Sequence, residues 1–296
     1  MKRVFLFLAT NIAILIIASI TMSLLGVGSM LEDSGTRLNL QALLVFCFIF
    51  GMAGSFISLL LSKKMVKWTM KPRMIDQPKN AQEEWLVSCV RRQADEAGLG
   101  MPEVGIFPAP QANAFATGWN RNKALVAVSE GMLQRFEKSE VEAVMGHEIG
   151  HIANGDMVTL ALIQGVINTF VMFLARIVGF TVDRVIFKNE QGFGIGYFIA
   201  TIATELLLAF LASTIVFWFS RRREFHADKA GARFGSRQGM IHALQRLKRD
   251  AQQPSPLPES MQAFGITGGK NTGLKRFFMS HPPLDDRIAA LQNMSD

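Results

Sequence analysis

Four long apolar stretches dominate the pattern of hydrophobic and polar positions along this chain. They cover residues 4–31, 38–62, 157–175 and 191–220, and Glu205 is the only charged residue within them. A helix needs about 20 residues to cross the hydrocarbon core of a bilayer, and each stretch reaches about that length. The pattern therefore predicts a mainly α-helical membrane protein with about four transmembrane helices.

Polar segments between these stretches divide the chain into four parts. Residues 1–62 are predicted to form a transmembrane hairpin, and residues 157–220 a second one. Residues 63–156 and 221–296 carry most of the charged side chains, so we expect both of them outside the lipid. Because the second hairpin crosses the membrane twice, it returns the chain to the face that it left, and the two polar parts should meet there.

Basic residues next to the apolar stretches predict the orientation. Lysines and arginines cluster in residues 63–73 and in residues 221–223, whereas the loop of residues 32–37 is slightly acidic. Short segments rich in Lys and Arg remain cytoplasmic. We therefore expect the N-terminus and both polar parts on the cytoplasmic side of the inner (plasma) membrane. Lys2 and Arg3 before an apolar run also fit a signal peptide, but this run is longer than a signal core and a second span follows at once.

The sequence His-Glu-Ile-Gly-His begins at His147 and has the pattern His-Glu-x-x-His. On a helix, residues four apart project from nearly the same face, one turn above the other. The imidazoles of His147 and His151 can therefore converge on one metal ion. Glu148 then stands beside the ion, free to take a proton from the attacking water.

The segments around this motif predict a helix that packs near a small sheet. A capping-box pattern, Ser139 with Glu142, predicts where the helix begins. Apolar residues then recur at helical spacing: Val141, Val144, Met145, Ile149 and Ile152. Upstream, the pattern predicts another helix over residues 81–97. Three short strands follow it, at residues 104–107, 111–118 and 124–128. This order of elements is expected of the upper lobe of a zincin.

A third metal ligand must come from outside the motif. The His that would extend a metzincin motif lies six residues past His151, where this chain has Met157. Glu224 is the expected ligand, because it follows the fourth stretch and should open a helix at the same membrane face as the motif. Asp228 shares its helix face and could accept a hydrogen bond from the outer nitrogen of a ligand histidine.

Other interpretations of these residues stay open. Glu224 and Asp228 could form a solvated face paired with the arginines at 221–223. Glu205 is a rival ligand, but it lies near the middle of the fourth stretch, where a helix–helix contact or lipid-level hydration also explains an ionisable group. His226 points to another side of the helix from Glu224, as is typical of a surface histidine.

Composition and charge exclude several functions. The chain has 31 Lys and Arg against 24 Asp and Glu, a net charge of +7 that is concentrated next to the apolar stretches and indicates contact with a membrane surface. No basic stripe interleaved with aromatic residues occurs, so we expect no nucleic-acid partner. Cys47 lies in the second apolar stretch and Cys89 in a predicted soluble helix, so no disulfide is expected, which fits a reducing compartment.

Taken together, these motifs resemble the HtpX-type membrane zinc endopeptidases, relatives of the Ste24 CaaX-processing proteases. The likeness covers the whole chain. Besides the apolar hairpins, it includes His-Glu-Ile-Gly-His followed by Ile-Ala-Asn-Gly-Asp, Ser220-Arg221 through Glu224 to Ala227-Asp228, and the closing His281-Pro282. The resemblance implies a zincin-like (gluzincin) catalytic domain on the membrane helices.

The resemblance also implies roles for individual residues. His147, His151 and Glu224 would bind one Zn²⁺ per chain. Glu148 would be the general base, and Asp228 would hold a ligand histidine. These expectations agree with the metal-binding pattern of the motif.

Substrate contacts are implied as well. The strand around Asn113 and Ala114 would bind an extended polypeptide through its backbone. His281 would stabilise the oxyanion, although a surface histidine before two prolines is an alternative. Zinc proteases often use a Tyr or His for this purpose, and the only tyrosine lies at the edge of the fourth stretch. Arg287 is a further candidate for oxyanion support, but an ion pair with the aspartates before it explains Arg287 equally well.

The predicted function is a membrane-embedded, zinc-dependent endopeptidase that cleaves misfolded or damaged membrane proteins at the cytoplasmic face, in quality control under stress. An intramembrane-cutting or CaaX-type processing protease is an alternative, although polar residues on both sides of the motif favour a zinc site outside the lipid. A non-enzymatic, zinc-stabilised membrane scaffold is a third, but a structural zinc site normally has four protein ligands and no use for Glu148. A loop at residues 251–273 is expected to border the substrate cleft. No feature of the sequence indicates an oligomeric state.

Overall fold

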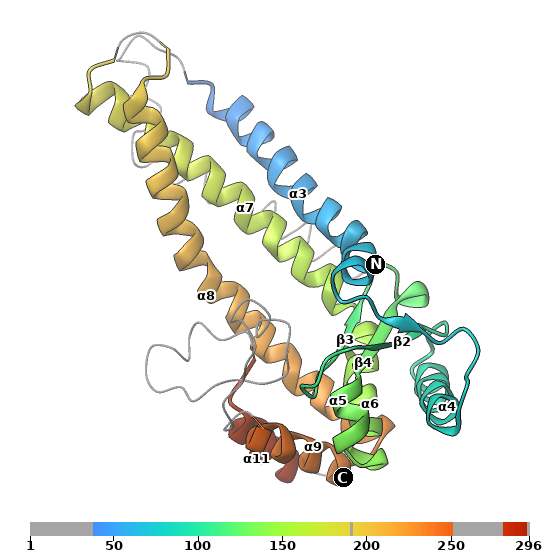
Figure 1. Cartoon of the computed structure of the whole chain (residues 1–296). Coiled ribbons are helices and arrows are strands. Elements are labelled where there is room, and N and C mark those ends of the chain that lie inside the picture. Colours follow the sequence, from blue (N-terminus) through green and yellow to red (C-terminus); the bar gives the residue numbers. More distant parts are fainter. Residues whose placement is uncertain (1–37, 190–191, 251–280, 295–296) are drawn as a thin grey trace. The chain divides into compact units, whose positions relative to one another are not determined.

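The computed structural model describes residues 38–189, 192–250 and 281–294 (Figure 1). Three predicted segments lie outside the described residues: the first span (4–31), the loop after it (32–37) and the loop of residues 251–273.

Three helices in the described part of the chain are long and apolar enough to cross a membrane. They are α3 (Leu40–Thr69), α7 (Asp156–Thr181) and α8 (Ile195–Phe234), and a short π-helical segment, Val182–Ile186, follows α7. Many of their large apolar side chains are exposed, as helices that face lipid require. The prediction of a mainly α-helical membrane protein is confirmed for these three spans.

One predicted helix boundary is wrong. Glu224 does not open a helix, because α8 continues without a break from the apolar stretch through residues 221–223 to Phe234. No Gly or Pro lies between Gly196 and Gly231, so nothing in this sequence ends the helix at the polar boundary. α8 is therefore one helix of 40 residues, with exposed apolar residues along its first half and acidic residues near its end.

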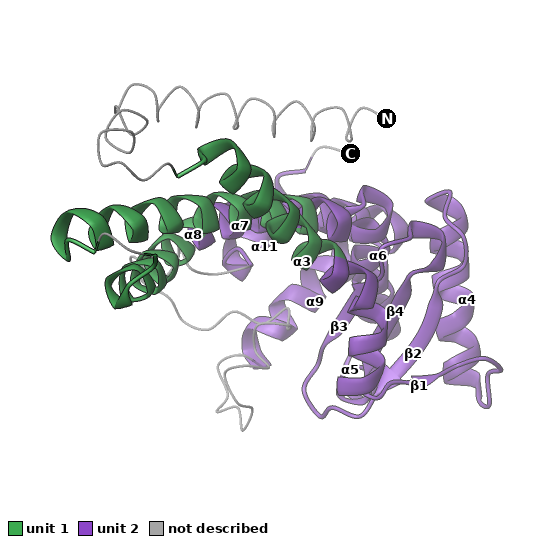
Figure 2. Cartoon of the chain, turned by 90° about the horizontal axis from the view of Figure 1, so that it is seen from above, with its two compact units in different colours: residues 1–56, 161–212 green, residues 57–160, 213–296 purple. Residues whose placement is uncertain are grey.

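The chain forms two compact units (Figure 2). Residues 1–56 and 161–212 make up the first, which we call the span unit. Residues 57–160 and 213–296 make up the second, which we call the sheet unit. The division into four parts along the sequence follows the membrane crossings instead of compactness, and it stays a prediction.

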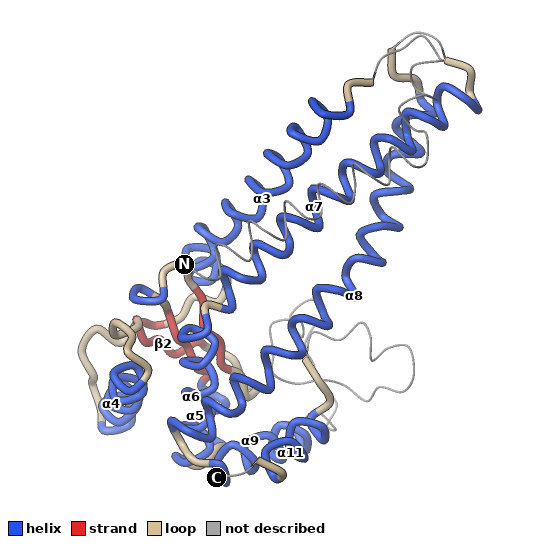
Figure 3. The backbone as a smooth tube through the Cα atoms, turned by 180° about the vertical axis from the view of Figure 1, so that it is seen from behind, coloured by secondary structure: helices blue, strands red, loops and turns tan. Residues whose placement is uncertain are grey.

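A small mixed sheet organises the sheet unit. Its strands are β1 (Arg73–Met74), β2 (Glu103–Phe107), β3 (Ala114–Thr117) and β4 (Leu125–Ser129). Their order is β1-β2-β4-β3, with β2 and β4 parallel and the two outer strands antiparallel to their neighbours (red in Figure 3). The three predicted strands are present, the second shorter than expected, whereas β1 was not predicted because two residues show no alternation. β3 is an edge strand of this sheet.

The described part of the sheet unit also contains five shorter α-helices: α4 (Ala81–Glu96), α5 (Glu130–Arg135), α6 (Lys138–Asn154), α9 (Arg237–Asp250) and α11 (Leu284–Gln292). The predicted cap of α6 is wrong by two residues. Glu137 is the N-cap, and its N–H donates to the side chain of Glu140 at 2.8 Å in a capping box. Glu142 is unavailable for the predicted pairing with Ser139 because it binds Arg92 of α4.

The start of α7 follows the end of α6 directly. Gly155 ends α6 with φ 65° and ψ 37°, a left-handed conformation that glycine adopts without strain. Asp156 is then the first residue of α7. The chain therefore turns sharply just after the motif, and Asp156 stays close to it.

Glu205 in the span unit does not stand alone. Its Oε1 lies 3.3 Å from Nη1 of Arg176, which joins α8 to α7. Arg176 also donates to the carbonyl of Met172 and lies over the ring of Phe46. Glu205 therefore takes part in a helix–helix contact, as an ionisable group within a span requires.

The motif helix α6 packs closely against α8 through a glycine. A Cβ atom on Gly150 would lie 2.5 Å from Cβ of Ala230 and 3.4 Å from Cα of Ala227. Two carbon atoms that are not bonded to each other do not approach to 2.5 Å, so any side chain at position 150 would push the two helices apart. The close approach brings His147 and His151 on α6 near the acidic residues of α8.

We expect Gly150→Ala to lower the free energy of unfolding by about 1–3 kcal/mol, because the added methyl overpacks this contact. Thermal unfolding in detergent measures the change. Gly54→Ala is the matched control, because among the described residues no atom outside its own helix backbone and chain neighbours lies within 4 Å of its added Cβ, and Ala favours a helix. An unfolding temperature for Gly150→Ala equal to that of the wild type would contradict the packing argument.

Candidate metal centre

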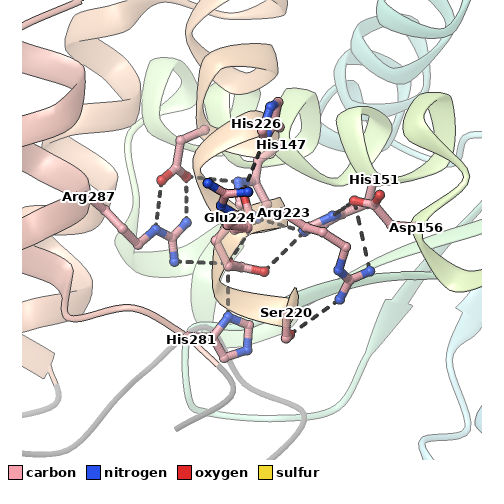
Figure 4. Close-up of polar contacts among 11 residues, drawn as sticks. His147, His151, Asp156, Ser220, Arg223, Glu224, His226, His281 and Arg287 are labelled. Atoms are coloured by element: carbon pink, nitrogen blue, oxygen red, sulfur yellow. Dashed lines mark hydrogen bonds and ion pairs between the residues drawn. The ribbon is translucent and has the colours of Figure 1, made fainter. Parts of the chain in front are cut away.

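Side chains from three helices and the segment before α11 converge in the sheet unit (Figure 4). α6 contributes His147, Glu148 and His151, α8 contributes Glu224 and Asp228, and His281 and Arg287 come from the start of the last segment. His147 and Glu148 are buried because α6 passes through the core of the unit, and the side chain of His151 is 14% exposed. Residues far apart in the sequence therefore share one buried region.

His147, His151 and Glu224 each bring one candidate ligand atom within 4.8 Å of the others. The Nε2 atoms of the two histidines lie 3.2 Å apart. Glu224 Oε2 lies 3.7 Å from Nε2 of His147, and Glu224 Oε1 lies 3.4 Å from Nε2 of His151. The three side chains thus present their nitrogen and oxygen atoms to a common point.

The separations between the two Nε2 atoms and the carboxylate oxygens of Glu224 fit a tetrahedral metal ion. An ion with ligand bonds of about 2.0–2.1 Å separates its ligand atoms by about 3.4 Å, which is close to the three separations found. Oε2 of Glu224 is buried without an aligned hydrogen bond, as expected for an oxygen that faces a cation. Two imidazoles and one carboxylate are also the donor set of many catalytic zinc sites.

Each of the two histidines is held through its other ring nitrogen. Nδ1 of His147 lies 3.0 Å from Asp228 Oδ1, and Nδ1 of His151 lies 2.7 Å from Asp156 Oδ2. A carboxylate accepts hydrogen bonds, so each Nδ1 carries a proton. Each Nε2 then keeps the lone pair that a metal ion beside Glu224 would bind. Burial alone lowers the pKa of His151, but hydrogen bonds with Asp156 and Glu224 outweigh it and raise that pKa to about 10. The carboxylates around His151 therefore favour a cation at its Nε2, a place that a metal ion can take.

Arg287 is fully buried and pairs with the acidic residues of α8. Its Nε lies 2.8 Å from Asp228 Oδ2, its Nη2 lies 2.5 Å from Asp228 Oδ1, and its Nη1 lies 3.2 Å from Glu224 Oε2. Burial alone lowers the pKa of Arg287, but Asp228 and Glu224 raise it above its ordinary value. The two aspartates before Arg287 are not its partners in these contacts, and Asp285 binds Lys248.

His281 and Glu148 lie beside the same carboxylate cluster. Nδ1 of His281 lies 2.9 Å from Glu224 Oε2, although the approach is not aligned as a hydrogen bond, and the side chain is 23% exposed. Glu148 is 5% exposed and sits one residue after His147. Within the described residues, no hydrogen bond or ion pair engages the Glu148 carboxylate directly.

Asn113 and Ala114 lie at the beginning of the edge strand β3. The backbone N–H of Asn113 donates to Ser129 Oγ at 2.9 Å, and its carbonyl accepts from the N–H of Ser129 at 2.8 Å. β3 also packs against α6, the helix that carries the motif. The structure therefore brings an edge strand next to the candidate metal ligands.

The sequence interpretation missed two residues of this site, Asp156 and Arg223. Asp156 follows the motif by one helical turn and a Gly, and the Asn-Gly-Asp sequence was a signal for a turn back toward His151. Arg223 was interpreted as a charge that sets the membrane orientation, or as a surface partner of Glu224 and Asp228. The remaining candidates are accounted for otherwise, because His226 is exposed and bonds the carbonyl of Arg222, and Cys47 and Cys89 are free and buried.

Fold and site together define a membrane-associated metallopeptidase of the His-Glu-x-x-His type. The model of peptidase family M48 matches residues 80–295. The chain therefore belongs to peptidase family M48, and it is a protease.

Several relatives share its whole length. Protease HtpX of Thioalkalivibrio sulfidiphilus is 61% identical over 99% of this chain and 99% of its own length. Protease HtpX of Hahella chejuensis is 61% identical over 98% and 99%, and that of Pseudomonas putida is 59% identical over 99% and 99%. The resemblance inferred from the motifs is confirmed.

A solved structure shares the fold. The crystal structure of Ste24p from S. mikatae superposes with a TM-score of 0.59 over 98% of this chain and 67% of that chain, at 17% sequence identity. The likeness in fold therefore extends over almost the whole chain, the three long apolar helices and the sheet included.

We expect Arg287→Met to lower the free energy of unfolding by about 3–5 kcal/mol, because it leaves Asp228 and Glu224 buried without their cation. Thermal or urea unfolding in detergent measures the loss. Lys248→Met is the control, since its pair with Asp285 is exposed and worth at most about 1 kcal/mol. Equal effects of the two substitutions would contradict a stabilising role for the buried pair.

Proposed function

We propose that His147, His151 and Glu224 bind one zinc ion per chain and that this site hydrolyses peptide bonds. The observation that carries the proposal is the convergence of their Nε2 and carboxylate atoms at separations of 3.2–3.7 Å. The family supports a metal-dependent peptidase, and the donor set favours zinc among the common metals.

The side chains around the ligands have separate roles in this proposal. A bound zinc ion would supply Lewis-acid chemistry by polarising the scissile carbonyl and activating water. Glu148 takes the proton from the attacking water and later delivers it to the leaving amine. His281 donates to the oxyanion that develops on the carbonyl, a role that its partial exposure and its place beside Glu224 support.

Arg287 acts differently in this proposal from the oxyanion support suggested by the resemblance. Its guanidinium is fully buried and engaged with Asp228 and Glu224, which favours a positioning role. Asp228 holds the Nδ1 proton of His147, so that Arg287 and Asp228 together fix the orientation of one ligand.

Substrate binding is proposed along β3. An extended polypeptide would add to the outer edge of β3, which pairs with no strand of the described residues, through backbone hydrogen bonds near Asn113 and Ala114. Backbone pairing selects extended chains more than particular side chains, so locally unfolded polypeptides are the favoured substrates. We infer that misfolded or damaged membrane proteins meet the site, in agreement with quality control under stress.

The site is proposed to lie outside the lipid on the cytoplasmic side of the inner membrane. All of its residues belong to the sheet unit, which favours cleavage of exposed loops over cleavage within spans. The basic residues 63–73 and 221–223 support the cytoplasmic orientation. A reporter fused after residue 296 that is found on the external side would contradict this orientation. A non-enzymatic scaffold is disfavoured by the family and by the unengaged carboxylate of Glu148.

We expect Glu148→Gln to bind zinc as the wild type does and to lose hydrolysis of casein, because the amide cannot accept the proton of water. Metal analysis and a protease assay on the detergent-solubilised full chain measure both properties. Glu142→Gln on the same helix is the control and should retain activity. A zinc-loaded Glu148→Gln protein that still cleaves casein would overturn the mechanism, and a wild type without zinc would overturn the metal site.

We expect His281→Ala to lower kcat about 10²–10³-fold with little change in KM, because the oxyanion forms only in the transition state. Steady-state kinetics on an unfolded fluorogenic protein substrate separate the two constants. His242→Ala is the matched control, since His242 is exposed and pairs only with Gln238 among the described contacts. A change confined to KM would instead indicate that His281 binds substrate.

A further inference from the structure

Asp156 and Arg223 extend the site beyond the residues that the proposed function uses (Figure 4). Asp156 is 6% exposed, and its Oδ2 lies 2.7 Å from Nδ1 of His151. Nη1 of Arg223 lies 3.9 Å from the same oxygen, and Nη2 of Arg223 donates to Ser220 Oγ at 3.3 Å. The carboxylate of Asp156 thus joins a histidine of α6 to an arginine of α8.

The same arrangement occurs twice around the candidate ligands. His147 is followed by Asp228 and then by Arg287, and His151 is followed by Asp156 and then by Arg223. Each imidazole therefore donates to a carboxylate that has an arginine beside it. The second arrangement differs in two ways. Its arginine is farther from the carboxylate, with 3.9 Å between Nη1 of Arg223 and Oδ2 of Asp156, and its carboxylate belongs to the first residue of α7.

We propose that Asp156, supported by Arg223, is a positioning residue that orients His151 toward the metal. The proposal rests on the metal site proposed above. Without an acceptor for its Nδ1 proton, the His151 ring would be free to rotate or to change tautomer, and Nε2 would no longer be directed at Glu224. Arg223 lies beside the carboxylate of Asp156 and is itself held by Ser220, which restrains the position of that carboxylate.

A helix-terminal role explains Asp156 less well. An aspartate in the first turn of α7 would favour the helix dipole wherever it pointed. The hydrogen bond found for Asp156, however, goes to His151 and not to a backbone N–H of α7. The left-handed Gly155 makes this possible, because it ends α6 and starts α7 at the very next residue.

Zinc affinity of the full chain in detergent tests the proposal without reference to activity. We expect Asp156→Ala to bind zinc about 10–100-fold more weakly than the wild type in competition with a chromogenic chelator. Asp156→Asn should lose less, because its amide oxygen can still accept from Nδ1. Glu140→Gln is the control, since Glu140 is equally buried on α6 but contacts neither histidine, and its zinc affinity should not change.

A second measurement separates positioning from stability. The rise in unfolding temperature when zinc is added to metal-free protein depends on zinc affinity, and we expect it to be smaller for both Asp156 variants than for Glu140→Gln. A lower unfolding temperature of the metal-free protein with unchanged zinc affinity would overturn the proposal, since that is the result of a purely structural role. If Asp156→Ala does not fold, the nearly isosteric Asp156→Asn still decides the question.

Substitution of Arg223 tests its part separately. Arg223→Lys keeps the positive charge and should retain near wild-type zinc affinity, whereas Arg223→Met should weaken it. Equal affinities of Arg223→Met and wild type would remove Arg223 from the proposal. A wild type that binds no zinc would instead overturn the proposed function itself, so the two failures are distinguishable.

Discussion

The structure of the site depends on one constraint, the confinement of four carboxylates in a buried space. Glu148, Asp156, Glu224 and Asp228 are each at most 6% exposed, and the arginines beside them are Arg223 and Arg287. Four formal negative charges against two positive ones leave an excess of two when the histidines are neutral, as metal ligands are. Buried charges are tolerated only when they are paired or bind a metal. A divalent cation between Glu224 and the histidines satisfies this requirement, so the charge balance and the geometry favour the same occupant.

The fold meets this constraint with long-range contacts. α6 brings the histidines, and the close approach at Gly150 brings them to α8. α11 then supplies Arg287 from the last part of the chain, fully buried against α8. None of these elements holds a complete site alone. The contacts of His147 with Asp228 and of Arg223 with Asp156 therefore join the two sequence segments of the sheet unit, and the residues around the candidate metal site also hold the tertiary structure together.

The sequence predicted those parts of the protein that depend on local pattern. Apolar length predicted the spans, and the spacing of His147 and His151 predicted one helix with one metal-facing side. Glu224 was found because membrane crossings constrain which segments can meet. The continuity of α8 was missed, since a change from apolar to basic residues resembles a helix boundary although nothing in it breaks a helix. The pairing of Arg287 with Asp228 was missed as well, because no local pattern indicates which of several nearby carboxylates a buried guanidinium will contact.

The length of α8 has a mechanical consequence. A helix rises about 1.5 Å per residue, so Glu224 lies about 44 Å along the axis from Ile195. A rod of that length that pivots at its far end by one degree displaces the carboxylate by about 0.8 Å. Bond lengths to a metal tolerate only a few tenths of an ångström. A tilt of α8 of even one degree against α6 would therefore disturb the separations between Glu224 and the two histidines.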